Sequence, residues 1–242
     1  MCKIAITAII LHLCLDNVCQ SAPARHKNSF EYDDEWETIV FSQTWPETFC
    51  KLRLHRNTNN YCVLPDKKYW WTVHGIWPST SKGEAPRCND KRRFNPEQIK
   101  PIENDLKEVW TNIMKEIGYY SLWRHEWKIH GTCAAKINAL NSELKYFSKG
   151  IDWNKQYPMS DILSAAEIFP SDTRELTIEE LRNAVKAKTG KQPKVLCAFI
   201  EGVQYVQELR ICFDKKLDFI DCKPKAYENC NLTKGFIYPA HV

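Results

Sequence analysis

Two stretches in the first third of the chain combine β-branched, aromatic and apolar residues in the way typical of strands. They read TIVFSQTW at 38–45 and YWWTVHGIW at 69–77, and a proline follows each of them, Pro46 and Pro78. Because proline has no N–H to donate to a neighbouring strand, it predicts the end of both strands. Gly75 lies inside the second stretch and indicates a bulge or a close approach of another group to the backbone.

The middle of the chain has the apolar spacing of helices. Each predicted helix begins at a residue whose side chain can accept a hydrogen bond from the first turn, and these capping residues are Asn95, Ser121, Ser160 and Thr177. Pro96 follows the first cap, and the apolar spacing of that helix extends to Ile113. The second helix is predicted to run through LWRHEWKIHGTC at 122–133, and the last to end at Gly190.

The last third of the chain returns to strands, which we expect at 194–200, 203–213 and 217–222, with a turn at Glu201 and Gly202. Helices grouped between two runs of strands predict an α+β fold, in which an antiparallel β-sheet packs against several α-helices. No low-complexity or Gly/Ser-rich linker divides the chain. Residues 22–242 are therefore predicted to form a single domain.

The N-terminus has the pattern of a signal peptide. Lys3 precedes an apolar run that is too short to anchor the chain in a bilayer, and small residues follow it. Residues 1–21 are thus predicted to be removed, by cleavage within about 19–24. We expect a secreted protein, with a lysosomal or vacuolar compartment as the alternative, and no stable membrane insertion.

The cysteines support the same destination. Three of the eleven lie in or beside the predicted signal peptide, and the remaining eight are Cys50, Cys62, Cys88, Cys133, Cys197, Cys212, Cys222 and Cys230. An even number in an oxidising compartment predicts four disulfides. No C-x-x-C pair occurs among the eight, which argues against structural zinc. The sequon at Asn231 predicts N-glycosylation, and the net charge of +4 suits an anionic partner.

Three histidines lie in segments dense with aromatic residues: His74, His125 and His130. Glu126 and His130 are four residues apart, so on a helix they share a face, and the carboxylate is expected to raise the pKa of His130 and orient its ring. His125 and Glu126 begin like the zinc motif H-E-x-x-H, but Ile129 occupies the place of its second histidine. No metal is therefore expected. RNA cleavage without metal needs a base for the 2′-hydroxyl and an acid for the leaving 5′-oxygen, and two histidines can provide both.

Two segments carry a resemblance to a known family. WTVHGIWP at 71–78 and HEWKIHGTC at 125–133 resemble the two active-site segments of the ribonuclease T2 family, which usually read close to FTIHGLWP and HEWxKHGTC. FSQTWPETFC at 41–50 and the last four cysteines resemble that family too, whereas residues 138–194 contribute least. The resemblance implies an endoribonuclease that needs no cofactor or metal and cleaves single-stranded RNA through a 2′,3′-cyclic phosphate.

The resemblance also implies roles for individual residues. His74 and His130 would be the acid/base pair, with His130 favoured as base although the order stays open. His125 would help to hold the phosphate, Glu126 would polarise the site, and Trp77 would stack a nucleobase. The implied disulfides are Cys50–Cys62, Cys88–Cys133, Cys197–Cys230 and Cys212–Cys222.

One position departs from the family pattern, because Ile129 stands where the family has a lysine. Lys128 is the nearest lysine, and its spacing from His125 predicts that it substitutes in part by binding substrate. An alternative function follows from the same departure. The chain could be a secreted effector, or a protein that binds RNA or a cell surface, with the same fold and weakened catalysis. In either case we expect a monomer.

Overall fold

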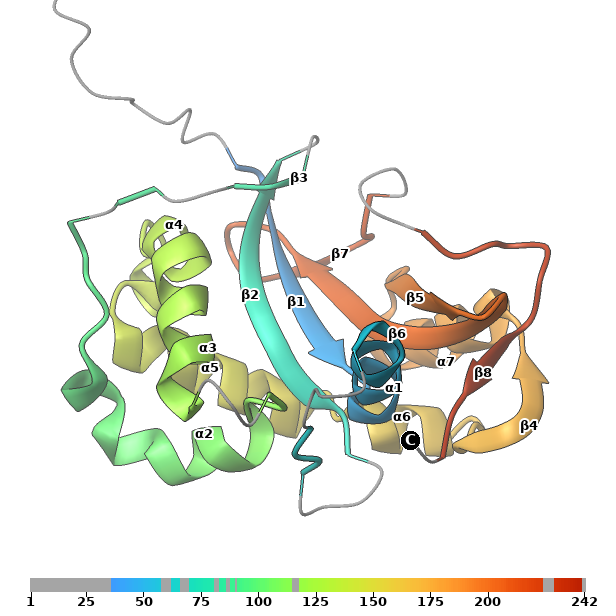
Figure 1. Ribbon diagram of the computed structural model, residues 1–242. Coiled ribbons are helices and arrows are strands. Elements are labelled where there is room, and N and C mark those ends of the chain that lie inside the picture. Colours follow the sequence, from blue (N-terminus) through green and yellow to red (C-terminus); the bar gives the residue numbers. More distant parts are fainter. Residues whose placement is uncertain are drawn as a thin grey trace, which may run out of the picture. The chain divides into compact units, whose positions relative to one another are not determined.

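A mostly antiparallel sheet of eight strands runs through the computed structural model (Figure 1). The structure describes residues 36–57, 62–65, 70–80, 83–85, 88–89, 91–114, 118–223 and 229–240. The strands are β1 (Thr38–Thr44), β2 (Thr72–Thr80), β3 (Gly83–Glu84), β4 (Ser171–Leu176), β5 (Lys194–Ile200), β6 (Val203–Phe213), β7 (Phe219–Ile220) and β8 (Phe236–Tyr238). Their order is β3-β2-β1-β6-β8-β4, and β5 and β7 also pair with β6. Among the strand pairs of the described residues, that of β6 with β8 is parallel and the others are antiparallel.

Of the helices that the structure describes, all but α1 lie between β3 and β5 along the chain. The helices are α1 (Pro46–Arg56), the 3₁₀-helix η1 (Pro96–Ile102), α2 (Glu103–Val109), α3 (Tyr119–Glu126), the π-helix η3 (Trp127–Gly131), α4 (Thr132–Ala134), the 3₁₀-helix η4 (Asn138–Leu140), α5 (Glu143–Gln156), α6 (Met159–Ser164) and α7 (Ile178–Thr189). The predicted α+β class is confirmed. All described residues belong to one compact unit, and the predicted signal peptide lies outside them.

The strand predictions were right in place and wrong in some bounds. The second strand begins three residues later than expected and continues through Pro78, which pairs with Ile39 of β1. The carbonyl of Pro78 accepts a hydrogen bond from the Ala85 N–H at 2.8 Å. The missing N–H of Pro78 therefore faces the same outer side, where β3 is only two residues long, so little pairing is lost. The expected strand at 217–222 shortens to β7, and β4 and β8 were not predicted.

Two of the four predicted helix caps were right. Asn95 accepts a hydrogen bond from the backbone of Glu97, and Thr177 forms the capping box with Glu180. The other two were wrong, because α3 begins after Gly118 and α6 after Pro158. The hydroxyl of Ser160 instead accepts a hydrogen bond from the backbone of Trp71. The helix expected to reach Ile113 ends at Val109.

Tryptophan side chains connect the helices to the sheet. Trp110 is fully buried, and its indole N–H donates to the carbonyl oxygen of His74 at 2.9 Å. Trp123, also buried, donates in turn to the carbonyl oxygen of Trp110 at 2.8 Å. A buried indole N–H needs such a partner, and each bond contributes about 1 kcal/mol. The strand that carries His74 is thus tied to α3.

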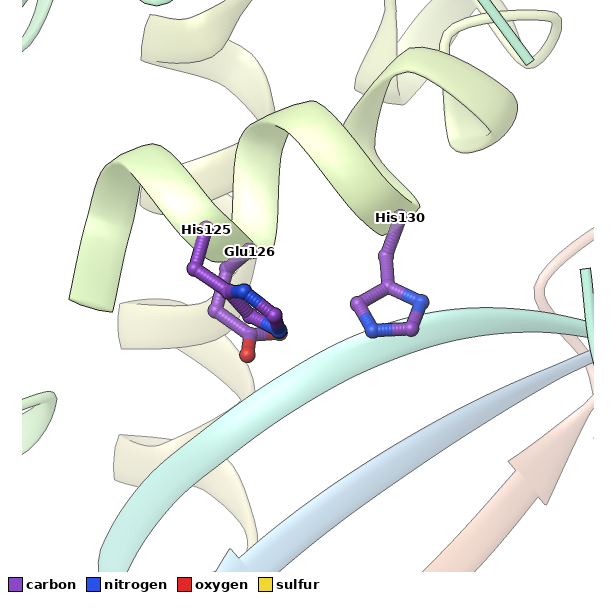
Figure 2. Close-up of side chains that lie close together, drawn as sticks. All are labelled: His125, Glu126 and His130. Atoms are coloured by element: carbon purple, nitrogen blue, oxygen red, sulfur yellow. The ribbon is translucent and has the colours of Figure 1, made fainter. Parts of the chain in front are cut away.

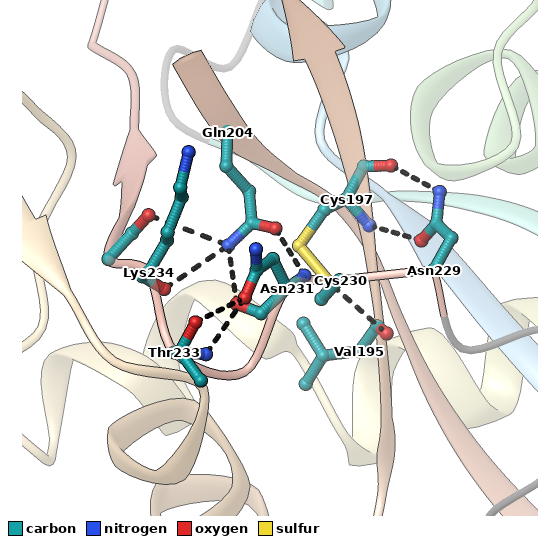
Figure 3. The surroundings of a disulfide bond; sticks show 9 residues. Val195, Cys197, Gln204, Asn229, Cys230, Asn231, Thr233 and Lys234 are labelled. Carbon is teal, nitrogen blue, oxygen red and sulfur yellow. Dashed lines mark hydrogen bonds between the residues drawn. A yellow bond between two sulfur atoms is a disulfide. The ribbon is translucent and has the colours of Figure 1, made fainter. Parts of the chain in front are cut away.

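Four disulfides cross-link the domain, in the same pairs that the family resemblance implies: Cys50–Cys62, Cys88–Cys133, Cys197–Cys230 and Cys212–Cys222. Figure 3 shows that Cys197–Cys230 joins β5 to the segment that precedes β8. The side chain of Asn229 accepts from the N–H of Cys197 at 2.9 Å and donates to its carbonyl oxygen at 2.6 Å. These two hydrogen bonds from the Asn229 side chain and the disulfide together fix this segment to the sheet.

Candidate active site

Three side chains from the helical side converge on one region. Figure 2 shows His125 and Glu126 at the end of α3 and His130 in η3, on the side of the helix that faces β2. One donor atom from each lies within 4.8 Å of the others. The predicted common face is therefore present. The wider π-helical turn at 127–131, a feature often found at functional sites, also brings His125 and His130 close, with 6.2 Å between their ring centroids.

The strand side contributes His74 from a bulge in β2. The register between β1 and β2 shifts between Ser42 and Gln43, opposite His74. A Cβ atom added to the next residue, Gly75, would overlap both the Trp77 indole nitrogen and Oε2 of Glu126. Sequence reasoning predicted either a bulge or a close approach at Gly75, and both are present.

Trp77 lies between the two sides of the site. Its indole N–H donates to Oε2 of Glu126 at 2.8 Å, and its ring centroid is 4.9 Å from that of His74 and 5.6 Å from that of His130. Only 3% of Trp77 is exposed. The expectation that this ring stacks a nucleobase is therefore wrong for the observed arrangement, because its faces are covered. Trp77 instead supports both histidines.

Two charged residues of β6 complete the strand side. Glu208 Oε1 lies 2.7 Å from Nδ1 of His74, and Glu208 Oε2 accepts from Nε and Nη2 of Arg210 at 2.9 and 2.7 Å. The Arg210 guanidinium lies over the Trp77 ring at 4.6 Å. Neither residue belongs to the two motifs. The run QELRICF nevertheless places opposite charges two apart in an apolar strand, which is the pattern of a buried ion pair on one face of a sheet.

The two histidines have opposite electrostatic surroundings. Partial burial lowers the pKa of His74, but the charge and hydrogen bond of Glu208 outweigh it, and the net pKa is raised. Burial alone would raise the pKa of Glu208, yet His74 and Arg210 hold it well below its usual range. Burial lowers the pKa of His130 to about 3, with smaller contributions from His125 and His74. At mildly acidic pH, His74 is therefore charged and His130 neutral.

The expected effect of Glu126 on His130 is wrong. Burial raises the pKa of Glu126 to about 7, which leaves the carboxyl largely uncharged at mildly acidic pH. Its Oε2 is engaged by Trp77, and Nδ1 of His130 is buried without a hydrogen-bond partner. The donor spacing of the three residues would allow a cation, and the same imidazole and carboxyl groups are those that proton transfer uses.

A cavity of about 340 Å³ opens beside His74 and His125. Its wall is mainly apolar, from side chains such as Phe49 and Leu122, with Asn112 among its polar groups. A concave site with a few polar groups in an apolar wall is typical of small organic ligands, and its size suits a nucleobase with its ribose. The two histidines at its edge place acid/base groups next to such a ligand.

The remaining predicted site residues lie outside this constellation. Lys128 is exposed, whereas its neighbours on the same helix, Glu126 and His130, are buried. Asn231 is exposed, and its Oδ1 accepts from the Thr233 hydroxyl at 2.8 Å (Figure 3). Within the part of the chain that the structure describes, no helix has the length and apolar character needed to cross a bilayer.

Comparisons with known proteins agree on one family. The model of the ribonuclease T2 family matches residues 36–222. Ribonuclease Oy of Magallana gigas is 33% identical over 213 residues, which cover 85% of this chain and 97% of the relative. Ribonuclease T2 of Sus scrofa is 35% identical over 201 residues, which cover 81% of this chain and 94% of the relative.

Solved structures give the same result for the fold. The crystal structure of human RNase T2 matches with a TM-score of 0.71 at 27% identity, over 85% of this chain and 99% of that chain. The crystal structure of RNase NT in complex with 5′-AMP matches with a TM-score of 0.70 at 25% identity, over 85% and 98% of the two chains.

Proposed function

Because the chain belongs to the ribonuclease T2 family of endoribonucleases, we propose that it cleaves single-stranded RNA by transphosphorylation. The 2′-oxygen attacks the adjacent phosphorus, the bond from phosphorus to the 5′-oxygen breaks, and a 2′,3′-cyclic phosphate remains on the 3′ end. One base must remove the 2′-hydroxyl proton and one acid must protonate the leaving oxygen.

His130 is the base and His74 the acid in this proposal. The neutral ring of His130 accepts the proton of the 2′-hydroxyl, and the charged ring of His74 gives its Nε2 proton to the leaving 5′-oxygen. His125 is exposed and lines the cavity, so its ring N–H donates a hydrogen bond to the phosphate. Glu126, protonated below pH about 7, donates a hydrogen bond to a phosphoryl oxygen.

One observation supports these roles: His74 and His130, which lie on either side of Trp77, have opposite electrostatic surroundings. Glu208 raises the pKa of His74, whereas burial lowers the pKa of His130 to about 3. An acid must hold its proton, and a base must be free of one, at the same pH. This difference between the pKa values of the two histidines predicts that activity persists at acidic pH and falls as His74 loses its proton.

The test uses the purified mature chain with single-stranded RNA and EDTA, from acidic to neutral pH. We expect products that end in a 2′,3′-cyclic phosphate, detected by ³¹P NMR. His74→Ala and His130→Ala should each abolish them, whereas His55→Ala, which changes a histidine at the end of α1, should not. Loss of activity in EDTA, or full activity of His130→Ala, would contradict the proposal.

A second candidate function is RNA or cell-surface binding with little turnover. Ile129 favours it, because a half-buried aliphatic side chain follows Lys128 where the family has a cation. Filter binding of RNA that is retained in the absence of measurable cleavage would support this alternative.

We also propose secretion with glycosylation at Asn231. The four disulfides suit an oxidising compartment, and the exposed asparagine already lies in a turn with Thr233. Expression in a secreting eukaryotic host should give a new N-terminus within about 19–24. Treatment with a peptide N-glycosidase should lower the mass of the native chain and leave Asn231→Gln unchanged.

A further inference from the structure

We propose that Glu208, held by Arg210, is a positioning residue for His74, fixing a proton on Nδ1 of the imidazole and leaving Nε2 to face the scissile phosphodiester. The inference rests on the proposed function, since it concerns the residue assigned there as the acid. It adds two residues of β6 that lie outside both motif segments.

Strand register brings the three groups together. Ser42 of β1 pairs with Gly75 of β2 on one side and with Arg210 of β6 on the other. Glu208 is two residues from Arg210, so both side chains lie on the same face of β6. This places a carboxylate and a guanidinium on β6, across β1 from the β2 bulge that carries His74.

The contacts of Glu208 leave it little freedom. One oxygen lies 2.7 Å from Nδ1 of His74, and the other accepts from Ser42 Oγ at 2.9 Å as well as from Arg210. Only 4% of the Glu208 side chain is exposed, against 38% for His74. A buried carboxylate that accepts from Nδ1–H of a catalytic imidazole fixes its tautomer and orientation and stabilises its charged form.

The other charged groups around His74 do not duplicate this contact. They are Arg210 on β6, Glu126 and His130 on the helical side, Glu84 on β3, and His125 across the cavity. Of the two other carboxyl groups, Glu126 accepts from the Trp77 indole through Oε2, and Glu84 lies 3.7 Å from Arg210. Glu208 is therefore the carboxylate that can act on Nδ1.

The pair has a defined part in the proton transfer. His74 Nε2 gives its proton to the leaving 5′-oxygen, while the Nδ1 proton stays between the imidazole and Glu208. Arg210 keeps Glu208 ionised throughout, so the carboxylate does not take up that proton. The neutral His74 that results is ready to deprotonate water when the cyclic phosphate is hydrolysed.

The direct test is an NMR titration of the full mature chain. In the wild type, the ¹⁵N shifts of His74 should show a proton retained on Nδ1 after the ring becomes neutral. In Glu208→Gln, the pKa of His74 should fall. In Glu84→Gln, which removes a carboxylate near Arg210 without touching His74, it should change far less. The wild-type spectrum decides the tautomer even if Glu208→Gln does not fold.

The second readout is the pH profile of kcat/KM. Glu208→Gln should move the alkaline limb to lower pH by the same shift as in the titration, and should leave the acid limb in place. On RNA, it should lose a large part of the ~10²–10⁴-fold contribution of general acid catalysis. On a uridine 3′-(4-nitrophenyl phosphate), whose leaving group needs no acid, the loss should largely disappear. A merely structural role would slow both substrates alike.

Two outcomes would overturn the inference: a neutral His74 with its proton on Nε2 in the wild type, or a Glu208→Gln enzyme with unchanged pKa and alkaline limb. If His74→Ala leaves RNA cleavage intact, the acid role assigned to His74 in the proposed function fails, and the role of Glu208 fails with it. If His74→Ala abolishes cleavage while Glu208→Gln behaves as wild type, only the role of Glu208 fails.

Discussion

The substitution Gly75→Ala tests how tightly the two sides of the site are packed. The added methyl group would overlap the Trp77 indole nitrogen and Oε2 of Glu126, the two atoms that share a hydrogen bond. The φ angle of Gly75 is outside the left-handed region, so the cost of the added methyl group is the steric overlap alone. Relief requires Trp77 to move, and Trp77 contacts the rings of both His74 and His130.

Overpacking costs about 1–3 kcal/mol, and a lost hydrogen bond to a carboxyl group costs a similar amount. Since one displacement causes both losses, we expect the free energy of unfolding to fall by about 2–4 kcal/mol. For a domain of this size, that corresponds to a Tm lower by roughly 4–16 °C. The loss of kcat/KM should exceed what unfolding explains, because acid and base are displaced together.

Thermal unfolding followed by circular dichroism, and RNA cleavage well below the Tm, measure the two effects. Gly190→Ala is the control, since Gly190 has a φ of 73° and its added Cβ meets nothing within 4 Å. That left-handed position should cost about 1–2 kcal/mol of stability and leave kcat/KM unchanged. A Gly75→Ala enzyme with normal Tm and normal activity would refute the packing argument.

Three further predictions concern pH, cross-linking and charge. The pKa of His130 is lowered from 6.5 to about 3. The stability that its neutral form contributes is therefore complete above pH 6.5 and is lost as the pH falls towards 3. In urea titrations, His130→Gln should lose less stability over that interval than the wild type, and an equal slope for both proteins would contradict the burial effect. Replacing both Cys88 and Cys133 by alanine should lower the free energy of unfolding by about 2–5 kcal/mol, measured by denaturant unfolding. Lys128→Ala should change kcat/KM little because Lys128 is exposed, whereas Glu126 and His130 are buried. Ile129→Lys, which restores the family cation, should raise kcat/KM. A large loss in Lys128→Ala would show that Lys128 already fills that role.

Local sequence signals predicted the elements that have a strong pattern or cap of their own. The β-branched and aromatic run at 38–45 became β1, and the capping box at Thr177 with Gly190 bounded α7. Weak or absent signals explain the misses. Ser121 and Ser160 can cap helices, but tertiary hydrogen bonds recruited the Ser160 hydroxyl, and Gly118 took the place before α3. The short strands β4 and β8 form through long-range pairing with each other.

The site was predicted one motif at a time, and its long-range contacts were not. The spacing of Glu126 and His130 gave the shared face but not the burial that sets their pKa values in opposite directions. Trp77 was expected at the substrate, although its indole is enclosed between strand and helix. Glu208 lies 134 residues after His74 in the sequence. Only strand register brings them together.

The enclosed indole at position 77 constrains any attempt to engineer the pH optimum. Because the Trp77 ring contacts both His74 and His130, a substitution of Trp77 would change the pKa values of both histidines at once. Independent adjustment has to come from residues that contact only one of the two histidines, such as Glu208 beside His74 or His125 beside His130. A mutant library aimed at those two positions would alter one limb of the activity profile at a time.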